Sequence, residues 1–156
     1  MVRTSKILFV VSWVLLMFLA LMIVLGSIAS AGTAFRGRDD RLGTVTTEQM
    51  RTAGGDDAVK AVRGRRLTAA TWALAFGILF GWVVAGPYRQ GRRWAWWALL
   101  ISLGVPELAS LARAPLIGTT VGTLEPAMVL VFLLLGLMAG APKTFSSHIT
   151  GLDSVD

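Results

Sequence analysis

Residues 7–31 read ILFVVSWVLLMFLALMIVLGSIASA, and none of them is charged. A helix needs about 20 apolar residues to cross the hydrocarbon core of a bilayer, and this run is longer. Two basic residues, Arg3 and Lys6, stand just before it. The stretch therefore predicts a membrane-spanning helix that follows a basic segment.

The same stretch shares one feature with secretory signal peptides. Ala29, Ser30 and Ala31 form a small-residue motif of the kind that a signal peptidase cleaves. The apolar part from Ile7 to Leu25, however, exceeds the roughly 7–15 residues of a signal-peptide core. We therefore expect a retained helix, with cleavage as the alternative.

Three more apolar blocks follow, at residues 67–86, 94–112 and 121–141. Hydrophobic residues make up 54% of the chain, more than soluble domains usually carry, because those need polar surface to face water. The pattern predicts an all-α fold: an integral membrane up-down four-helix bundle formed by a single domain. A polar loop at 33–66 and a polar tail at 142–156 complete the expected layout.

The loop at 33–66 is rich in charge and is expected to be irregular in its first half. Asp56, just after Gly54 and Gly55, is a plausible N-cap for a short helix that continues into the second span. Asp56 and Lys60 stand four residues apart, a spacing that favours an ion pair on that helix. Pro87 is expected to end the second span.

Small residues recur every four positions in two of the spans. At this spacing they lie on one stripe of a helix and let two backbones approach closely, which is how membrane helices associate. Tryptophans near the span ends are expected to lie at the membrane–water interface. The predicted packing residues are Ala69, Ala73, Gly77, Gly81, Gly136 and Gly140.

The net charge of the chain is +6, and its arginines lie beside the apolar spans. We expect them to contact membrane lipids, through anionic headgroups, and to set topology rather than to bind nucleic acid. The chain has no cysteine and a single histidine, His148, in the polar tail. Thiol chemistry and disulfides are therefore excluded, and we expect no metal site and no cofactor.

Basic residues flank both sides of the expected bundle, so its orientation depends on which of them are weighted. The short turn with Arg89, Arg92 and Arg93, and the basic start of the first helix, lie on one side. Charges in short loops near the first helix usually dominate orientation. We therefore expect a multi-pass protein of the cell (inner) membrane with both termini in the cytoplasm.

Two carboxylates, Glu107 and Glu125, lie inside apolar segments, where an ionisable group is costly. Both belong to the side opposite the termini and are expected at similar depth. With Arg65 or Arg66, and Arg113, they predict a small polar cavity suited to proton transfer or to a cationic ligand. The threonines expected nearby are Thr68, Thr71, Thr119, Thr120 and Thr123.

Simpler roles exist for the same residues. Glu125 precedes Pro126 and can stabilise the positive N-terminal end of a helix near the headgroups. Glu107 can form a structural ion pair with an arginine of the second span. His148 can be an ordinary solvated tail residue.

The segment YRQGRRWAWWAL at residues 88–99 resembles the second-to-third helix connection of small four-span bacterial membrane proteins of uncharacterised activity. A basic turn, a glycine and a Trp-Ala-Trp-Trp start are shared. The resemblance implies a four-helix bundle and a bacterial origin, and it implies no activity.

We expect first a non-enzymatic protein, such as an accessory subunit of a membrane complex, with a membrane-protein partner or as a homo-oligomer. The first alternative is a protein that binds or transports a small ligand in a cavity near Glu107 and Glu125. The second is a membrane-embedded enzyme that uses these carboxylates as acid and base on an apolar or lipid substrate. The ligand-binding alternative requires that both carboxylates face the same interior space.

Overall fold

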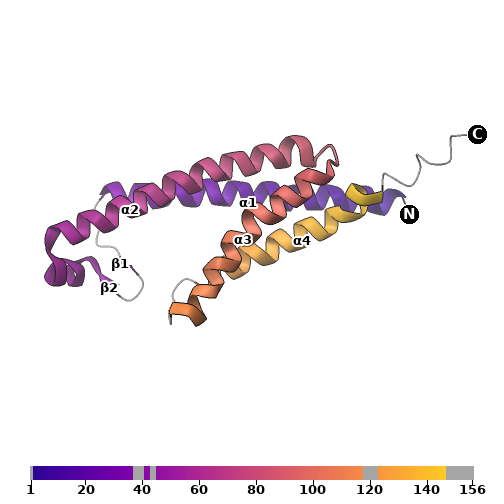
Figure 1. The fold of residues 1–156 in the computed structure, drawn as a ribbon. Helices are drawn as coiled ribbons and strands as arrows, with labels where there is room; N and C mark the ends of the chain where they lie inside the picture. The colour runs from indigo at the N-terminus through magenta and orange to yellow at the C-terminus, as the bar shows by residue number, and fades with distance from the viewer. Residues whose placement is uncertain (1, 37–40, 43–44, 118–122, 147–156) are drawn as a thin grey trace, which may run out of the picture.

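The computed structural model describes residues 2–36, 41–42, 45–117 and 123–146. Nearly all of them are helical, so the prediction of an all-α fold is confirmed (Figure 1). The helices are α1 (Val2–Arg36), α2 (Thr47–Val83), the π-helical turn η1 (Val84–Tyr88), α3 (Arg93–Ile117) and α4 (Leu124–Ser146). A small antiparallel hairpin, β1 (Arg41–Leu42) and β2 (Val45–Thr46), precedes α2.

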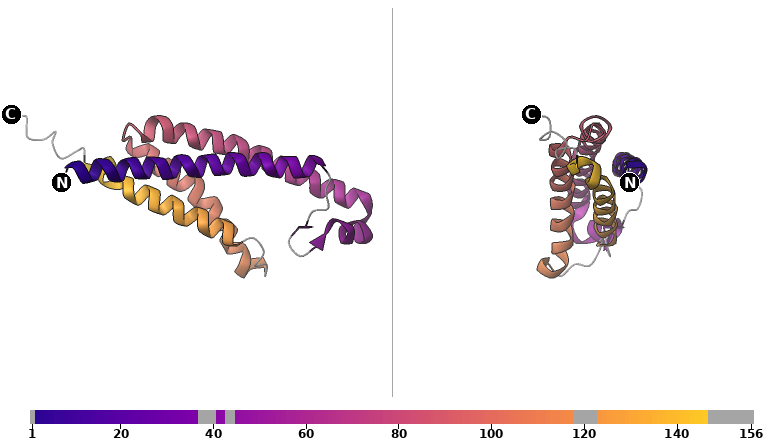
Figure 2. Two further views of the ribbon diagram at one scale, coloured as in Figure 1. Left: turned by 180° about the vertical axis from the view of Figure 1, so that it is seen from behind. Right: turned by 90° about the vertical axis from the view of Figure 1, so that its right-hand side faces the viewer.

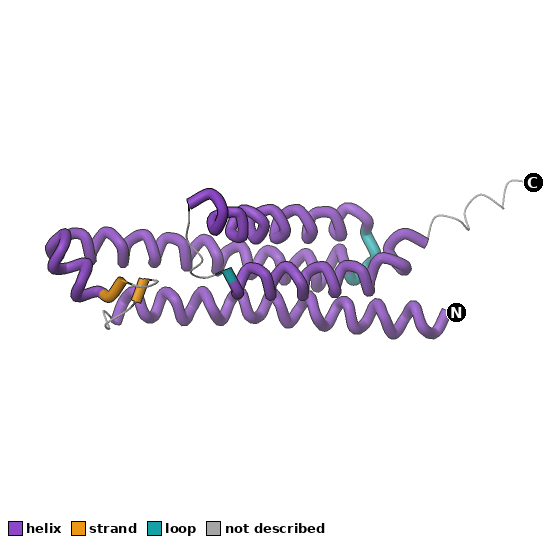
Figure 3. The backbone as a smooth tube through the Cα atoms, turned by 90° about the horizontal axis from the view of Figure 1, so that it is seen from below, coloured by secondary structure: helices purple, strands orange, loops and turns teal. Residues whose placement is uncertain are grey.

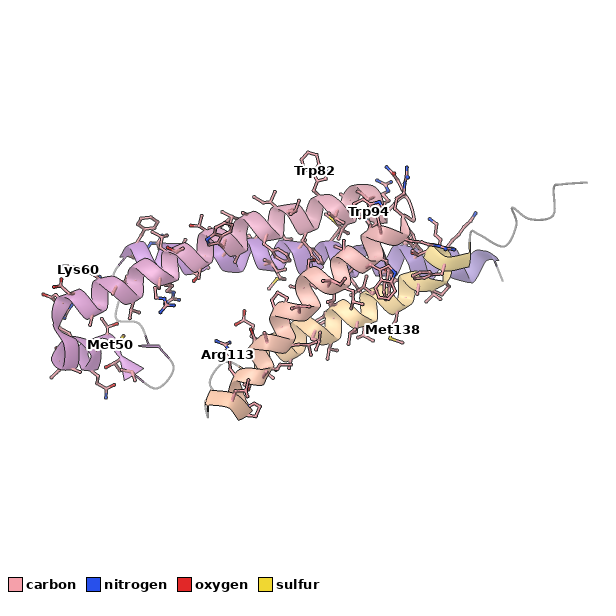
Figure 4. The ribbon with its side chains drawn as sticks, viewed as in Figure 1. Met50, Lys60, Trp82, Trp94, Arg113 and Met138 are labelled. Atoms are coloured by element: carbon pink, nitrogen blue, oxygen red, sulfur yellow. The ribbon has the colours of Figure 1, made fainter. Side chains whose placement is uncertain are left out.

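Four stretches of these helices are long and apolar enough to cross a membrane: Lys6–Arg36, Thr47–Tyr88, Arg93–Arg113 and Leu124–Phe145. In the most apolar window of each stretch, only 22–28% of the residues are buried inside the protein. Most apolar side chains therefore face outward, as Trp82 and Met138 do (Figure 4). A surface of this kind suits hydrocarbon better than water, and it is the surface of a multi-pass membrane protein.

Helix α1 packs against both α2 and α4, and α4 also packs against α3, whereas α2 and α3 barely touch. The start of α1 and the end of α4 lie at the same end of the molecule (Figure 3). At that end the helices converge, and towards the opposite end the α3–α4 pair diverges from the α1–α2 pair (Figures 1 and 2). We call these the closed end and the open end.

Glycines permit the close helix contacts. A Cβ on Gly77 would come within 2.9 Å of Ile23, and one on Gly136 within 3.0 Å of Leu16. Both contacts are with α1, which is thus held on two sides by neighbouring backbones. A Cβ on Gly81 would also face α1, at 3.5 Å from the Ala20 Cβ.

The buried core lies mainly towards the closed end. It is built from apolar side chains of all four helices and from Tyr88 of η1, whose hydroxyl is hydrogen-bonded to that of Ser12. A Cβ on Gly140 would overlap both of these hydroxyl groups. The fully buried apolar residues include Leu16, Val84, Tyr88, Ala95, Leu133 and Leu137.

The sequence predicts that Pro87 ends the second span, and this prediction is wrong. Helical structure continues through η1 to Tyr88. In a π-helical turn an N–H reaches the carbonyl five residues back, so the residue after a proline can serve the carbonyl that the proline cannot. The chain then turns at Gly91, whose φ of 75° is a left-handed conformation that favours glycine.

The connection expected as a loop at 33–66 is largely helical, which corrects that prediction. Helix α1 runs on to Arg36, and α2 begins at Thr47 with a capping box in which Thr46 and Gln49 hydrogen-bond each other's backbone N–H. Gly55 interrupts α2 with a φ of 71°, so a new helical segment does begin at the position expected from the sequence. The expected start of the fourth span at residues 121–122 and the tail beyond Ser146 lie outside the described residues.

The ion pairs of this segment differ from the expected pair. Lys60 pairs with Asp57 at 3.0 Å, and Asp56 instead accepts a hydrogen bond from Arg51 at 2.9 Å. Arg51 also pairs with Glu48, at 3.1 Å. These side chains are solvent-exposed, so the pairs contribute little to stability.

The tryptophans do not all behave as interfacial residues. Trp72, Trp82, Trp94 and Trp97 are exposed. Trp96, in contrast, is half-buried and donates a hydrogen bond from Nε1 to the Leu137 carbonyl at 2.9 Å. It therefore ties α3 to α4, which the sequence pattern did not indicate.

Candidate functional site

A cavity of about 400 Å³ lies at the open end, between the diverging helix pairs. All four long helices contribute to its wall. Its polar lining residues are Ser27, Ser30, Glu107, Ser110, Arg113 and Glu125. The two carboxylates singled out in the sequence therefore face one space.

Helix α3 supplies Glu107, Ser110 and Arg113, which stand three residues apart and share one side of the helix. The Arg113 Nε donates to the Ser110 carbonyl at 3.3 Å, and Arg113 lies towards the open end of α3 (Figure 4). Glu107 is half-buried and Arg113 is exposed. Glu107 therefore occupies the more sheltered part of the cavity.

Glu125 reaches the cavity from the first turn of α4. The N-terminal end of a helix carries a partial positive charge, which favours a carboxylate at this position. Pro126 follows it, buried in the cavity wall, where a proline near a helix start costs no hydrogen bond. Glu125 itself is exposed, so it lies near the mouth of the cavity.

The opposite wall is mostly apolar and comes from α1 and α2. This wall is lined by Met22 and Ile23 of α1 and by Ala69, Ala70 and Ala73 of α2. Ala69 and Ala73, expected to pack against a neighbouring helix, here line the open space. Their small side chains leave room that a larger residue would fill.

The arginines of the second span are placed unequally. Arg66 Nε donates to Ser30 Oγ at 3.3 Å, so its guanidinium lies beside a residue of the cavity wall. Arg65 is exposed and is not among the lining residues. The structure thus brings Glu107, Glu125 and Arg113 to one cavity, places Arg66 against Ser30 of its wall but outside the lining, and leaves Arg65 away from it.

The expected threonines that the structure describes, Thr68, Thr71 and Thr123, do not line the cavity. Thr68 and Thr71 are exposed, and each donates to the backbone carbonyl four residues earlier in its own helix. Thr123 is half-buried at the start of α4, and Thr119 and Thr120 lie outside the described residues.

Two serines of α1 belong to the cavity and were not expected there. Ser27 is buried and donates to the Ile23 carbonyl at 2.6 Å, which satisfies its hydroxyl within the helix. Ser30 lies one turn further and contacts Arg66. The signal was present, because these residues stand three apart in an otherwise apolar span, but their partners were not evident.

The described residues that line the cavity include two carboxylates and one guanidinium, that of Arg113, while Arg66 contacts Ser30 from outside this lining, so the lining itself carries more negative than positive groups. Such a space attracts a cation rather than an anion. Within the described parts of the chain, no group of three or more acidic or histidine side chains could hold a metal ion. His148 lies outside those parts.

Comparison of the chain with protein-family models, with curated proteins and with solved structures finds no significant match. Arguments about function therefore rest on the cavity and the surfaces of this molecule.

Proposed function

We propose that this protein binds a small organic monocation in the cavity at its open end. The observation that carries the proposal is that Glu107 and Glu125 come from different helices and line one space, in which Arg113 is the one arginine among the described lining residues. The volume of about 400 Å³ lies within the range of about 300–1,000 Å³ usual for small-molecule sites.

The lining offers the ligand both charged groups and an apolar surface. Glu107, the more sheltered carboxylate, is the main counter-charge, because electrostatic attraction strengthens where water is excluded. Glu125 at the mouth attracts the cation during entry. The wall of Met22, Ile23 and the α2 alanines packs against the apolar part of the ligand.

The proposal includes the membrane setting. In it the chain is an up-down four-helix bundle in the cell membrane of a bacterium, with both termini in the cytoplasm. The basic start of α1 and the three arginines at 89–93 support that orientation. The open end then faces away from the cytoplasm, and the ligand enters from that side.

The test uses the purified full chain in detergent and measures binding calorimetrically. The probe is tetraphenylphosphonium, an apolar monocation, compared with neutral triphenylphosphine oxide. Glu107→Gln, which keeps the shape and removes the charge, is expected to weaken tetraphenylphosphonium binding about tenfold, or about 1.4 kcal/mol.

The matched control is Asp57→Asn, which removes one negative charge from an exposed side chain that does not line the cavity. It should leave the affinity unchanged. Equal binding of the neutral compound by the wild-type protein, or full affinity in Glu107→Gln, contradicts the proposal.

A second candidate is the accessory subunit expected from the sequence, and a groove on the outer face of α2 and η1 favours it. The groove measures about 390 Å³ and is lined by Ile78, Gly81, Trp82, Ala85 and Gly86. A Cβ on Gly86 would meet no packed neighbour among the described residues within 4 Å, so internal packing does not require a glycine there. A helix of another membrane protein would use that space.

This candidate is tested by cross-linking in native membranes. A stoichiometric partner should be captured by the wild-type chain and lost with Gly86→Leu, which fills the groove. Gly32→Leu, also without a neighbour within 4 Å, is the control and should keep the partner. Retention of the partner by Gly86→Leu rules out this surface.

A further inference from the structure

A second cavity, of about 350 Å³, lies at the closed end, away from the carboxylates. Its lining residues are Phe9, Val10 and Trp13 of α1, Arg89 after η1, and Lys143 of α4. Two of the five carry positive charge and none carries negative charge. We propose that this cavity binds a phosphate anion, supplied by the headgroup of an anionic membrane lipid.

Both cations are held in place by aromatic rings. The Arg89 guanidinium carbon lies 5.6 Å from the centre of the Trp13 ring, and the Lys143 Nζ lies 3.8 Å from that of Phe9. Cation–π contacts orient a positive charge without neutralising it. The two side chains are therefore preorganised and keep their charge for a ligand.

No acidic side chain among the described residues competes for these cations. The described carboxylates lie at the polar start of α2 (Glu48, Asp56 and Asp57) and at the open-end cavity (Glu107 and Glu125). The indole N–H of Trp13 is also buried without an acceptor in this part of the chain. The polar groups of this cavity are thus all donors, with no carboxylate beside them among the described residues, and a phosphate carries several acceptor oxygens.

The position of the cavity along the helices matches a lipid headgroup. Arg89 directly follows the end of the second span at Tyr88, and Lys143 lies in the last turn of the fourth, which ends at Phe145. Phosphates of a bilayer lie at this level, just outside the hydrocarbon. Phe9, Val10 and Trp13 continue inward as an apolar wall along which an acyl chain can lie.

A neighbouring arginine shows that the arrangement is selective. Arg93 donates to the Phe145 carbonyl at 3.2 Å, and its guanidinium lies over the Phe145 ring. Its charge is therefore engaged at the C-terminal end of α4. Arg92, in the same turn, is not among the residues that line the cavity. Only Arg89 of the three turn arginines is directed to the second cavity.

The test places the full chain in detergent and measures retained lipid by native mass spectrometry, with phosphatidylglycerol and phosphatidylcholine as probes. The wild-type protein should prefer phosphatidylglycerol, and the double variant Arg89→Gln/Lys143→Gln should weaken that binding about tenfold or more. The control double variant Lys6→Gln/Arg92→Gln removes the same number of positive charges outside the cavity and should keep the affinity for phosphatidylglycerol. Arg89→Lys, which retains the positive charge, should keep most of the affinity.

Competition by inorganic phosphate distinguishes the two sources of the same anion. Displacement of phosphatidylglycerol at millimolar phosphate would assign the cavity to a soluble phosphate, and persistence of the lipid would assign it to a headgroup. The proposal is overturned if the wild-type protein binds both lipids equally, or if the control double variant loses as much affinity as the cavity variant. Helicity measured by circular dichroism confirms that each variant is folded.

Discussion

The hydroxyl groups of Ser12 and Tyr88 are hydrogen-bonded to each other inside the closed end, and Gly140 of α4 makes room for both. This pair joins α1 to η1 across 76 positions of sequence in an otherwise apolar core. A buried polar pair of this kind is tolerated only when each group has its partner. The stability of the closed end therefore depends on three residues from three elements.

Gly140→Ala is expected to destabilise the protein by about 1–3 kcal/mol, because the new methyl group would overlap the Tyr88 and Ser12 hydroxyls. Denaturation in a mixed-micelle titration with sodium dodecyl sulfate measures the loss. Gly32→Ala, whose methyl group meets nothing within 4 Å, should be neutral or stabilising. Equal behaviour of the two variants would contradict the close contact.

Tyr88→Phe should cost about 1–2 kcal/mol, because the Ser12 hydroxyl is left buried without its partner. It should also reduce the cost of Gly140→Ala, since the Tyr88 oxygen is the nearest atom to the new methyl group. A double-mutant cycle in the same titration measures this coupling. Strict additivity of the two changes would show that the residues are not in contact.

Trp96→Phe should destabilise the α3–α4 pair by about 1 kcal/mol, since it removes the hydrogen bond to the Leu137 carbonyl and keeps an aromatic ring. Trp94→Phe is the matched control, because Trp94 is 56% exposed. Cysteine cross-linking between α3 and α4, introduced into this cysteine-free chain, offers a second measurement. A loss of stability in Trp94→Phe but not in Trp96→Phe would show that Trp96 does not tie α3 to α4.

Arg113→Gln is expected to strengthen binding of tetraphenylphosphonium by about three- to tenfold, because it removes the one positive charge among the described residues that line the open-end cavity. The gain should shrink as salt is raised, since Arg113 is exposed and its field is screened. Arg65→Gln, which removes a charge outside the lining, provides the comparison. Weaker binding by Arg113→Gln would mean that the guanidinium holds the ligand.

The four helices could be predicted because a bilayer requires long uncharged runs, and residues 7–31 alone satisfy that requirement. The helical start of α2 does not show in the charge and glycine content of this segment, and only its capping residues indicate it. The sequence Thr46-Thr47-Glu48-Gln49 carries the Thr-x-x-Gln signature of a capping box, which the structure forms. Local signals therefore predicted each span and could also have predicted this helix start.

The candidate site was predictable only in part. Counting residues from the span ends placed Glu107 and Glu125 at similar depth, and the cavity contains both. Which helices diverge was not predictable, because it depends on how Gly77 and Gly136 seat α1 between its neighbours. Ser27 and Ser30 were missed for the same reason, since one sequence does not tell which face of α1 meets the cavity.

The π-helical turn η1 sets the direction of both Tyr88 and Arg89. Relative to an α-helix it holds one additional residue, and removing that residue would rotate every following side chain by about 100°. Tyr88 would then leave the core, and Arg89 would leave the ring of Trp13. The one additional residue of η1 thus sets the position of both the buried hydroxyl pair and Arg89 of the proposed lipid site.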